Sequence, residues 1–543
     1  MKLSRWWRCG ALLAAVALLG TACQSSGGSG SSTSGAEKTL VYATPALPLT
    51  YDPCFITGQQ TAEILTNLYS FWAYYKVGTL PDGAPGDSTQ AGENSMGPGM
   101  LKSWDLSPDG TVYTLHIRQG AKDSYGNEMT ATDMQWVLDR VSHLGGCPFV
   151  TSNMGITDVS KQVAVVDKYT VKVTLSAPDP IFIRMLAVNN GAAVGPEARK
   201  HVTSDDPWAA NWAKANAAAT GPYKVESLSP GVQMVLVSNP NFYGPKPEIT
   251  KIIYKEVPQA SNRVAVLLSG QAQAARDLSQ DQLNQISQNK NANIQCTTAN
   301  DMMNVAINAA SGPTANPQVR QALAYAVPYD DIIKSVFNSR AKRLYGMVPS
   351  LYPAYIGDGQ YPYSLDINKA KQMLASAGYP NGFNATVMID TATPEHERAA
   401  ILLQNSLKQI GVNLSIDTKP IASYTDALQG HTYGDLAIWQ DHSLVIDIDY
   451  HAKLFLAPGP PPSFNFSGWL NPEFIALEQQ AVAMPGGPQR DTVLQRMQAI
   501  FNQNVPWLSL ANTPTCFAFL KKVSGYVWHT FNQVYFSDLK LGS

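Results

Sequence analysis

The histidines are the residues best suited to catalysis or metal binding, but their spacing supports neither role. Eight histidines are scattered along the chain. His396 precedes Glu397, yet no second histidine follows at the spacing of a zinc-binding helix. The sequence also lacks a G-x-S-x-G elbow, a G-x-x-x-x-G-K phosphate loop and a G-x-G-x-x-G turn. These observations predict a protein that is not an enzyme and that holds no cofactor and no metal.

The six cysteines are divided between the N-terminal segment and the rest of the chain. Cys9 and Cys23 fall in the N-terminal segment. The other four are spread through the chain: Cys54, Cys147, Cys296 and Cys516. An even number of cysteines in an exported chain is typical of disulfides, and no C-x-x-C pair indicates a zinc or redox site. Four cysteines allow three pairings, and their spacing does not choose among them. Four buried thiols are the alternative.

Residues 1–22 have the pattern of a secretory signal peptide. Basic side chains precede an apolar run from Ala11 to Leu19, which is shorter than the roughly 20 residues that cross a bilayer. Small residues then lead to Cys23 in an arrangement that resembles a lipobox, although Gly20 stands where that motif has leucine. We expect a lipidated Cys23 and a flexible Ser/Gly linker over residues 23–37. An ordinary secreted protein with a cysteine near its cleavage site is the alternative.

Composition excludes several other classes of protein. The formal net charge is −2, 15% of the residues are charged, and no basic stripe is present, so nucleic acid is not an expected partner. After the signal segment, no apolar stretch reaches the roughly 18 residues that indicate a membrane helix. A mature chain of about 520 residues is too long for one hydrophobic core and predicts two or more lobes.

Strands and helices are predicted throughout the rest of the chain. Residues 111–118 alternate with Tyr113, Leu115 and Ile117 on one face, and a helix with a capping box at Thr130 and Asp133 follows. Further strands are predicted at residues 39–44, 169–175, 222–225, 232–237, 252–257, 302–307, 412–416, 436–439 and 507–510. Further helices are predicted at residues 61–72, 263–268, 280–286, 319–327, 366–377, 398–410, 474–483 and 491–502. The mixture predicts an α/β fold with mixed sheets.

Residues 100–140 resemble the extracellular solute-binding proteins of the peptide-binding type, family 5. The matching positions are Trp104, Asp109, Gly110, Arg118, Gly120, Gly126, Thr130, Ala131 and Asp133. The chain departs from the family at residues 123–125, where an aromatic residue and His-Asp are common. The blocks TGPYKV, NPNFYG, RVAVLLSGQ, VRQALAYAV, KAKQMLASAGY and LKQIGVNL follow in the family's order. The resemblance covers nearly all of residues 38–530.

The resemblance implies a two-lobe fold of the periplasmic-binding-protein type, in its type II, large family 5 variant. A ligand then lies in the cleft, and the lobes close on it by hinge motion. Mapped onto this chain, lobe I comprises residues 38–296 and 515–543, and lobe II comprises residues 297–514. Because the crossing segments are neighbours in the family, the resemblance also implies a Cys296–Cys516 disulfide, which leaves Cys54–Cys147 within lobe I.

The resemblance also implies where a ligand would bind. In peptide-binding members, an acidic stretch of lobe II reaches the cleft, and a carboxylate pairs with the α-amino group of the peptide through charge-assisted hydrogen bonds. Here Ile448 replaces the family's usual proline, and the loop is longer. The alternative is that Asp441 and Asp447 cap turns or face solvent and that Trp439 belongs to the core. The candidate ligand-binding residues are Trp439, Asp441 and Asp447, together with Tyr51, Asn189 and Asn190 in regions that match cleft-facing parts of the family.

The function implied is that of an extracytoplasmic solute-binding lipoprotein. It would capture an oligopeptide or dipeptide and deliver it to the permease subunits of an ABC transporter. We expect a monomer that is lipid-anchored at the outer face of the cell membrane. A surface receptor for a signalling peptide and a binder of sugars, opines or metal chelates are the alternatives. Some relatives carry nickel or haem, for which His431 and His442 near the predicted cleft would serve.

Overall fold

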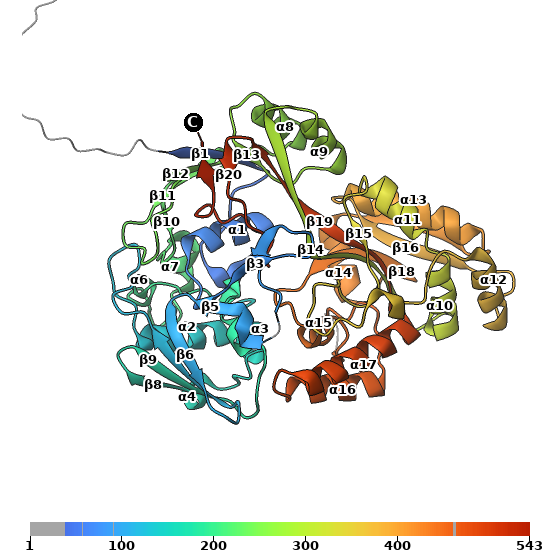
Figure 1. Ribbon diagram of the computed structural model, residues 1–543, viewed down its shortest axis with the longest axis horizontal. Coiled ribbons are helices and arrows are strands. Elements are labelled where there is room, and N and C mark those ends of the chain that lie inside the picture. Colours follow the sequence, from blue (N-terminus) through green and yellow to red (C-terminus); the bar gives the residue numbers. More distant parts are fainter. Residues whose placement is uncertain (1–37, 57, 91, 460–462, 543) are drawn as a thin grey trace, which may run out of the picture. The chain divides into compact units, whose positions relative to one another are not determined.

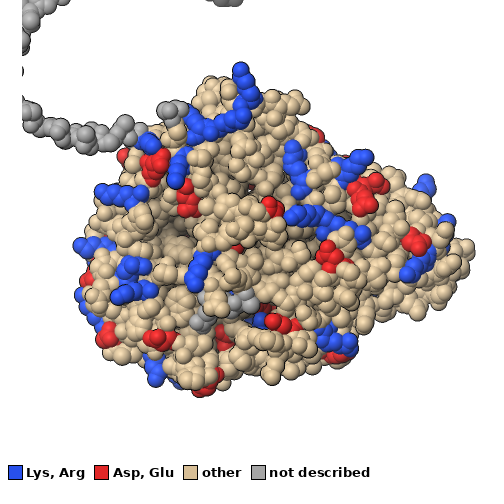
Figure 2. Space-filling view, in the orientation of Figure 1, with Lys and Arg blue, Asp and Glu red and all other residues tan. Residues whose placement is uncertain are grey.

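The computed structural model describes residues 38–56, 58–90, 92–459 and 463–542. The predicted signal peptide, the lipidated Cys23 and the linker therefore lie outside the described residues. Among the described residues, no helix combines the length and the apolar character that crossing a bilayer requires. On the face in Figure 2, basic and acidic side chains are interspersed among uncharged residues, in keeping with the formal net charge of −2.

One mixed sheet of eleven strands runs through the molecule in the order β10-β11-β12-β1-β13-β19-β14-β18-β16-β17, with β15 paired to β19 beside this path. β1 is parallel to β12 and β13, and β16 is parallel to β17 and β18, whereas the other pairs are antiparallel. The strands are β1 (Thr39–Thr44), β10 (Tyr223–Ser229), β11 (Gln233–Ser238), β12 (Lys251–Glu256), β13 (Ala274–Ala275), β14 (Ala292–Ile307), β15 (Lys342–Arg343), β16 (Asn384–Asp390), β17 (Asn413–Lys419), β18 (Leu436–His442) and β19 (Trp507–Leu520).

A smaller antiparallel sheet has the order β6-β7-β9-β8. Its strands are β6 (Leu101–Leu106), β7 (Val112–Ile117), β8 (Val163–Asp167) and β9 (Thr170–Thr174). Tyr113, Leu115 and Ile117 of β7 are buried on one face, as their alternation predicts. Three short pairs complete the strands: β2 (Ala73–Tyr75) with β5 (Met96–Pro98), β3 (Val77–Thr79) with β4 (Pro85–Asp87), and β20 (Val523–Ser524) with β21 (Lys540–Leu541).

Two of the helices begin where the sequence predicts capping residues. At the start of α2 (Ala131–His143), the N–H of Thr130 donates to Asp133 Oδ2 over 2.9 Å. At α12 (Ile367–Ser376), the N–H of Lys369 donates to Asp366 Oδ1 over 2.9 Å. The other helices are α1 (Gln59–Leu68), α3 (Pro148–Ser152), α4 (Val159–Gln162), α5 (Phe182–Met185), α6 (Pro196–Arg199), α7 (Ala210–Ala215), α8 (Ala260–Leu268), α9 (Gln280–Ser287), α10 (Pro317–Tyr325), α11 (Tyr329–Asp331), α13 (Pro394–Lys408), α14 (Ile421–Gln429), α15 (Ile448–Phe455), α16 (Pro472–Val482) and α17 (Pro488–Asn504).

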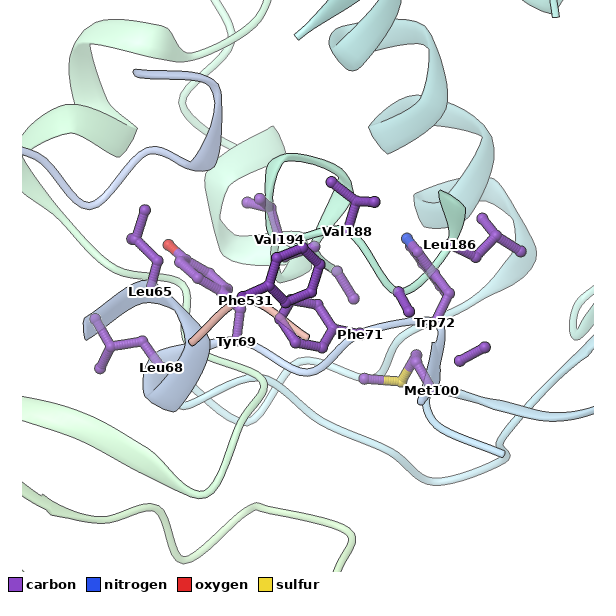
Figure 3. Packing of buried hydrophobic residues seen from close by; sticks show 14 of the residues in the cluster. Leu65, Leu68, Tyr69, Phe71, Trp72, Met100, Leu186, Val188, Val194 and Phe531 are labelled. Carbon is purple, nitrogen blue, oxygen red and sulfur yellow. The ribbon is translucent and has the colours of Figure 1, made fainter. Parts of the chain in front are cut away.

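The first hydrophobic core is built around α1, α2 and the chain that follows α1. Figure 3 shows Phe71 close to Phe531, and their ring centroids lie 6.1 Å apart. The indole N–H of Trp72 donates to the carbonyl of Gly191 over 3.0 Å. These contacts explain why α1 ends at Leu68 rather than at the predicted residue 72: the next residues leave the helix to enter this core. They also show that the C-terminal segment packs against the N-terminal part of the chain.

β14 and β19 cross the molecule side by side as a long antiparallel pair, which Figure 1 shows running from β13 towards β18. Both are much longer than predicted, because pairing with each other, and for β19 also with β13 and β15, carries the strand conformation through the polar residues near the disulfide. Cys296 and Cys516 face each other in this ladder and form one disulfide. Cys54 and Cys147 form the other. Both implied pairings are confirmed.

Strand β18 lies between the second and the third hydrophobic cores, and its alternating side chains face one or the other. Leu436 and Ile438 face the second core, which lies under α10, α12 and α13. Ala437 and Trp439 face the third core, which contains residues of α14 to α17. Because side chains alternate along a strand, Asp441 lies on the same face as Trp439. α14, α15 and β16, which border this region, were not predicted.

His529 joins the C-terminal segment to β4 through two acidic side chains. Its Nδ1 lies 2.9 Å from Asp87 Oδ1, and its Nε2 lies 2.8 Å from Asp538 Oδ2. Burial alone would lower the pKa of His529, but the carboxylates of Asp87 and Asp538 outweigh it and raise that pKa to about 10.

We expect this pair of contacts to make stability depend on pH. Since the folded pKa of His529 lies above its ordinary value of 6.5, its contribution is fully present below pH 6.5 and is lost as pH rises towards 10. Thermal unfolding of the wild type from pH 6 to 10 should show a steeper loss of stability than that of His529→Gln. His116→Gln, a change at a more exposed histidine paired with Asp105, is the matched control. Parallel pH curves for wild type and His529→Gln would contradict this prediction.

Candidate ligand-binding cavity

A cavity of about 700 Å³ lies beside the end of β18. β18 supplies Trp439 to His442, β14 supplies Asp301, and the chain of β19 supplies Thr513 to Thr515. Gln59 at the start of α1 also lines the cavity. Much of the remaining wall is apolar and comes from α14, α15 and the segments that follow β18 and α15: Ile421, Leu428, Leu444, Leu454, Phe455, Phe464 and Phe466. The cavity therefore combines a large apolar surface with a few acidic side chains, as ligand sites commonly do.

Among the described residues, Asp441 is the acidic side chain in this cavity whose carboxylate has no hydrogen-bond partner. Its backbone lies opposite Met302 in the β14–β18 ladder. Both of its carboxylate oxygens are inaccessible to solvent, and neither has a hydrogen-bond partner among the described residues. Burial raises the pKa of Asp441 well above its ordinary value, and the nearby carboxylate of Asp301 adds to the rise. Such a carboxylate gains stability from any ligand that brings N–H donors and a positive charge.

Asp301 is a second acidic residue of the cavity, and the sequence did not single it out. Its Oδ2 accepts hydrogen bonds from the hydroxyl of Thr515 and, over 2.8 Å, from the amide of Asn532. Its Oδ1 lies 3.4 Å from Nδ1 of His442. Asp301 is therefore already engaged by groups from β18, β19 and the C-terminal segment, unlike Asp441.

His396 and Asp390 form a buried pair at the cavity wall that the sequence also did not reveal. Asp390 ends β16, and its Oδ1 accepts the N–H groups of Ala392 and Thr393 over 2.7 and 2.8 Å. Nδ1 of His396 lies 2.7 Å from Asp390 Oδ2. Burial opposes ionisation of Asp390, but His396 and these N–H groups lower its pKa to about 2.

The second ring nitrogen of His396, Nε2, is buried, and the residue lines the cavity. The residue is 3% exposed, it lines the cavity, and its Nε2 has no hydrogen-bond partner among the described residues. The signal in the sequence is an aspartate at a strand end followed six positions later by a histidine in a new helix. Because β16 was not predicted, that signal could not be used.

Trp439 belongs both to the third core and to the cavity wall. Its ring lies 5.0 Å from that of Phe455, 5.0 Å from that of Phe466 and 5.8 Å from that of Trp507. Its indole N–H has no acceptor among the described residues. Trp439 therefore packs in the core and also lines the cavity.

Asp447 lies apart from the cavity, in an ion cluster of its own. Its side chain accepts the N–H of Asp449 over 3.0 Å at the start of α15. Nη1 of Arg184 lies 3.1 Å from its Oδ2, and Arg490 donates to both oxygens over 3.0 and 2.9 Å. Asp447 is 4% exposed, so the two arginines satisfy it within the protein. It therefore has a structural role in this geometry.

The remaining candidates are not brought to the cavity. Asn189 and Asn190 lie near the Cys54–Cys147 disulfide, where the Asn190 amide donates to the carbonyl of Pro53 over 3.1 Å. The carbonyl of Tyr51 accepts the hydroxyl of Tyr69 in the first core. Of the two histidines considered for metal chelates, His442 lines the cavity, whereas His431 bonds to Ser463. In the part of the chain that the structure describes, no three His, Cys, Asp or Glu side chains are grouped to hold a metal ion.

An α/β fold with a ligand-sized cavity beside long crossing strands is typical of solute-binding proteins. The model of the bacterial extracellular solute-binding proteins, family 5 (middle region), matches residues 95–459, more than half of the chain. The chain therefore belongs to this family, whose members are binding proteins that work in transport.

Similar proteins extend the match to nearly the whole chain. The chain is 25% identical to the dipeptide-binding protein of Escherichia coli (strain K12), over 93% of this chain and 95% of that protein. It is 26% identical to heme-binding protein A of Haemophilus influenzae, over 96% of each. Its fold matches, with a TM-score of 0.77 and 23% identity, the ABC transporter-associated periplasmic binding protein DppA from Helicobacter pylori in complex with the peptide STSA, over 93% of this chain and 98% of that one. The predicted two-lobe fold is thereby confirmed.

Proposed function

We propose that this protein captures short peptides, by pairing their α-amino group with Asp441. The observation that carries the proposal is the buried carboxylate of Asp441, which has no partner among the described residues and lies on the wall of a cavity of about 700 Å³. An ammonium group has three donors and a positive charge, so it satisfies both oxygens and offsets the cost of burying them. The dipeptide-binding relative supports peptides as the ligand class.

The rest of the proposed role follows the family. The protein acts as a binding component that delivers its ligand to ABC permease subunits and performs no catalysis. Cys23 carries the lipid that holds it at the outer face of the cell membrane, and it works as a monomer. Lobe I comprises residues 38–296 and 515–543, and lobe II comprises residues 297–514. The second core, all of whose residues lie between Met303 and Ala511, supports a separate lobe II.

The proposal predicts that Asp441→Asn weakens the binding of a short peptide by at least about thirtyfold, since the ammonium loses its charged partner in a buried site. Isothermal titration of the purified full-length protein with Leu-Phe, or with its C-terminal amide, measures the change. In thermal unfolding, a ligand at a hundredfold excess over Kd should stabilise the wild type by about 2.7 kcal/mol.

The matched control is Asp417→Asn, which changes an aspartate on β17 whose side chain is 47% exposed. That variant should bind like the wild type. N-acetylation of the peptide should reproduce the effect of Asp441→Asn, because it removes the ammonium from the other side of the pair. Equal binding by wild type and Asp441→Asn would refute the proposed site.

A further inference from the structure

The charges that line the cavity are unbalanced. Three carboxylates line it, those of Asp301, Asp390 and Asp441, together with the imidazoles of His396 and His442. Among the described residues that line it, none is a lysine or an arginine. The internal residues outside the described ranges are threonine, alanine and prolines, so they supply no basic side chain either.

The two imidazoles do not reverse this balance, because each already faces a carboxylate. His396 lies 2.7 Å from Asp390, and His442 lies 3.4 Å from Asp301. With both imidazoles protonated and all three carboxylates ionised, the lining still carries a net charge of −1, from three negative and two positive groups. With Asp441 protonated it reaches zero. In none of these protonation states does the wall present a net positive charge to a ligand.

A neighbouring cavity of about 290 Å³ shares Gln440 and Thr513 to Thr515 with the first, and the one arginine among the described residues of its lining is Arg276. That arginine is 4% exposed and already paired. Its Nη1 lies 2.9 Å from Glu63, and its Nε lies 3.3 Å from Asp277. Asp277 and Glu395 also line this second cavity. A ligand that extends into it therefore meets two carboxylates beside one arginine that is already neutralised.

We infer that the ligand is a cation without a free carboxylate: an amine with an apolar body, such as a C-terminally amidated peptide. The inference rests on the proposed pairing of an ammonium with Asp441 and narrows the ligand class. A ligand carboxylate placed here would lose its hydration and find no cation to pair with, which is costly in a buried site. The aromatic rings of Phe455, Phe464 and Phe466 provide the surface for the apolar body.

Four compounds of one size test the inference: Leu-Phe, Leu-Phe amide, and the N-acetyl form of each. At pH 7 the full-length protein should bind Leu-Phe amide at least about tenfold more tightly than Leu-Phe, because only the latter buries an unpaired carboxylate. Both N-acetyl forms should bind more weakly than Leu-Phe amide. Isothermal titration of each compound gives the four affinities.

The outcomes separate the inference from the proposed function. If Leu-Phe binds as tightly as its amide and both lose affinity on N-acetylation, the pairing with Asp441 stands and the inference is refuted. If neither Leu-Phe nor its amide binds, or if acetylation has no effect, the proposed function fails, and the inference fails with it. An amide preference that depends on the free amine supports both.

A gain-of-function variant tests the cause of the preference. Gln440 is exposed and lines both cavities, so Gln440→Arg adds one cation at their junction. We expect this variant to bind Leu-Phe at least about tenfold more tightly than the wild type does, which removes the amide preference. Gln440→Met, of similar length but uncharged, should keep the preference. An unchanged preference in Gln440→Arg would overturn the inference that cavity charge sets it.

Discussion

Asp447→Ala is expected to lower the free energy of unfolding by about 3 to 5 kcal/mol, the usual cost of removing one partner from a buried ion pair. The change leaves the guanidinium of Arg184 buried without a carboxylate and that of Arg490 with only its longer contact, 3.3 Å, to Asp449, and both arginines are less than 5% exposed. Burial alone would raise the pKa of Asp447, but Arg490 and Arg184 outweigh it and lower that pKa. The carboxylate is therefore held in its charged form by the two arginines.

The effect should be large because the cluster joins three elements. Arg184 lies on α5, Asp447 precedes α15, and Arg490 lies on α17. Arg184 Nη1 also donates to the carbonyl of Ile446 over 3.1 Å. Loss of the carboxylate removes bonds that tie α5, in the N-terminal part of the chain, to two helices near its C-terminus, and it also removes the N-cap of α15.

Chemical denaturation of the full-length protein measures this change. Asp417→Ala, at an aspartate on β17 whose side chain is 47% exposed, should cost less than about 1 kcal/mol and is the matched control. Asp447→Asn should fall between the wild type and Asp447→Ala, since the amide keeps one acceptor. A loss in Asp447→Ala no larger than in the control would contradict the role assigned to the cluster.

The contrast between Asp441 and Asp447 shows how far sequence could locate the site. Both acids follow Trp439 within eight residues, and both matched the acidic stretch of the family. The structure separates them: Asp441 still lies on a strand facing the cavity, whereas Asp447 caps a helix and meets two arginines. Arg184 and Arg490 are distant from Asp447 in sequence, so no local pattern could indicate that Asp447 forms ion pairs with them.

Elements whose residues determine their own conformation were predicted well. The capping box at Thr130 and the alternation of β7 depend on neighbouring residues, and both are present. β14 and β19 were predicted too short, because the missed part of β14 is largely polar and the missed part of β19 is interrupted by Asn512 to Thr515, and pairing with neighbouring strands extends both. The Asp390–His396 pair was missed for a related reason: its geometry depends on β16, whose strand conformation is set by pairing with β17 and β18.

The affinity for an amine-bearing ligand is expected to rise with pH, by up to about tenfold per unit. Burial raises the pKa of Asp441, so below that pKa the carboxyl carries a proton before the ligand arrives. An ammonium group pairs with the ionised form of Asp441, so binding releases this proton. The affinity for the ligand therefore increases as the pH rises. The affinity therefore rises over a pH range above 4, in which an ordinary aspartate is already ionised. The rise ends at the pKa of Asp441 or, for a peptide, near pH 8, where the α-amino group loses its own proton.

Titrations with Leu-Phe amide between about pH 5 and 8, in two buffers of different ionisation enthalpy, give both the affinity and the number of protons released. Asp301, His442 and Tyr352 are the other titratable groups close to Asp441. His442→Gln should keep the slope, because the proton comes from Asp441, whereas Asp441→Asn should abolish it. The amide is the better probe because it carries one titratable group and no carboxylate of its own. An affinity that stays level or falls between pH 5 and 7 would mean that Asp441 is already ionised before binding, and its carboxylate would then need a partner within the protein.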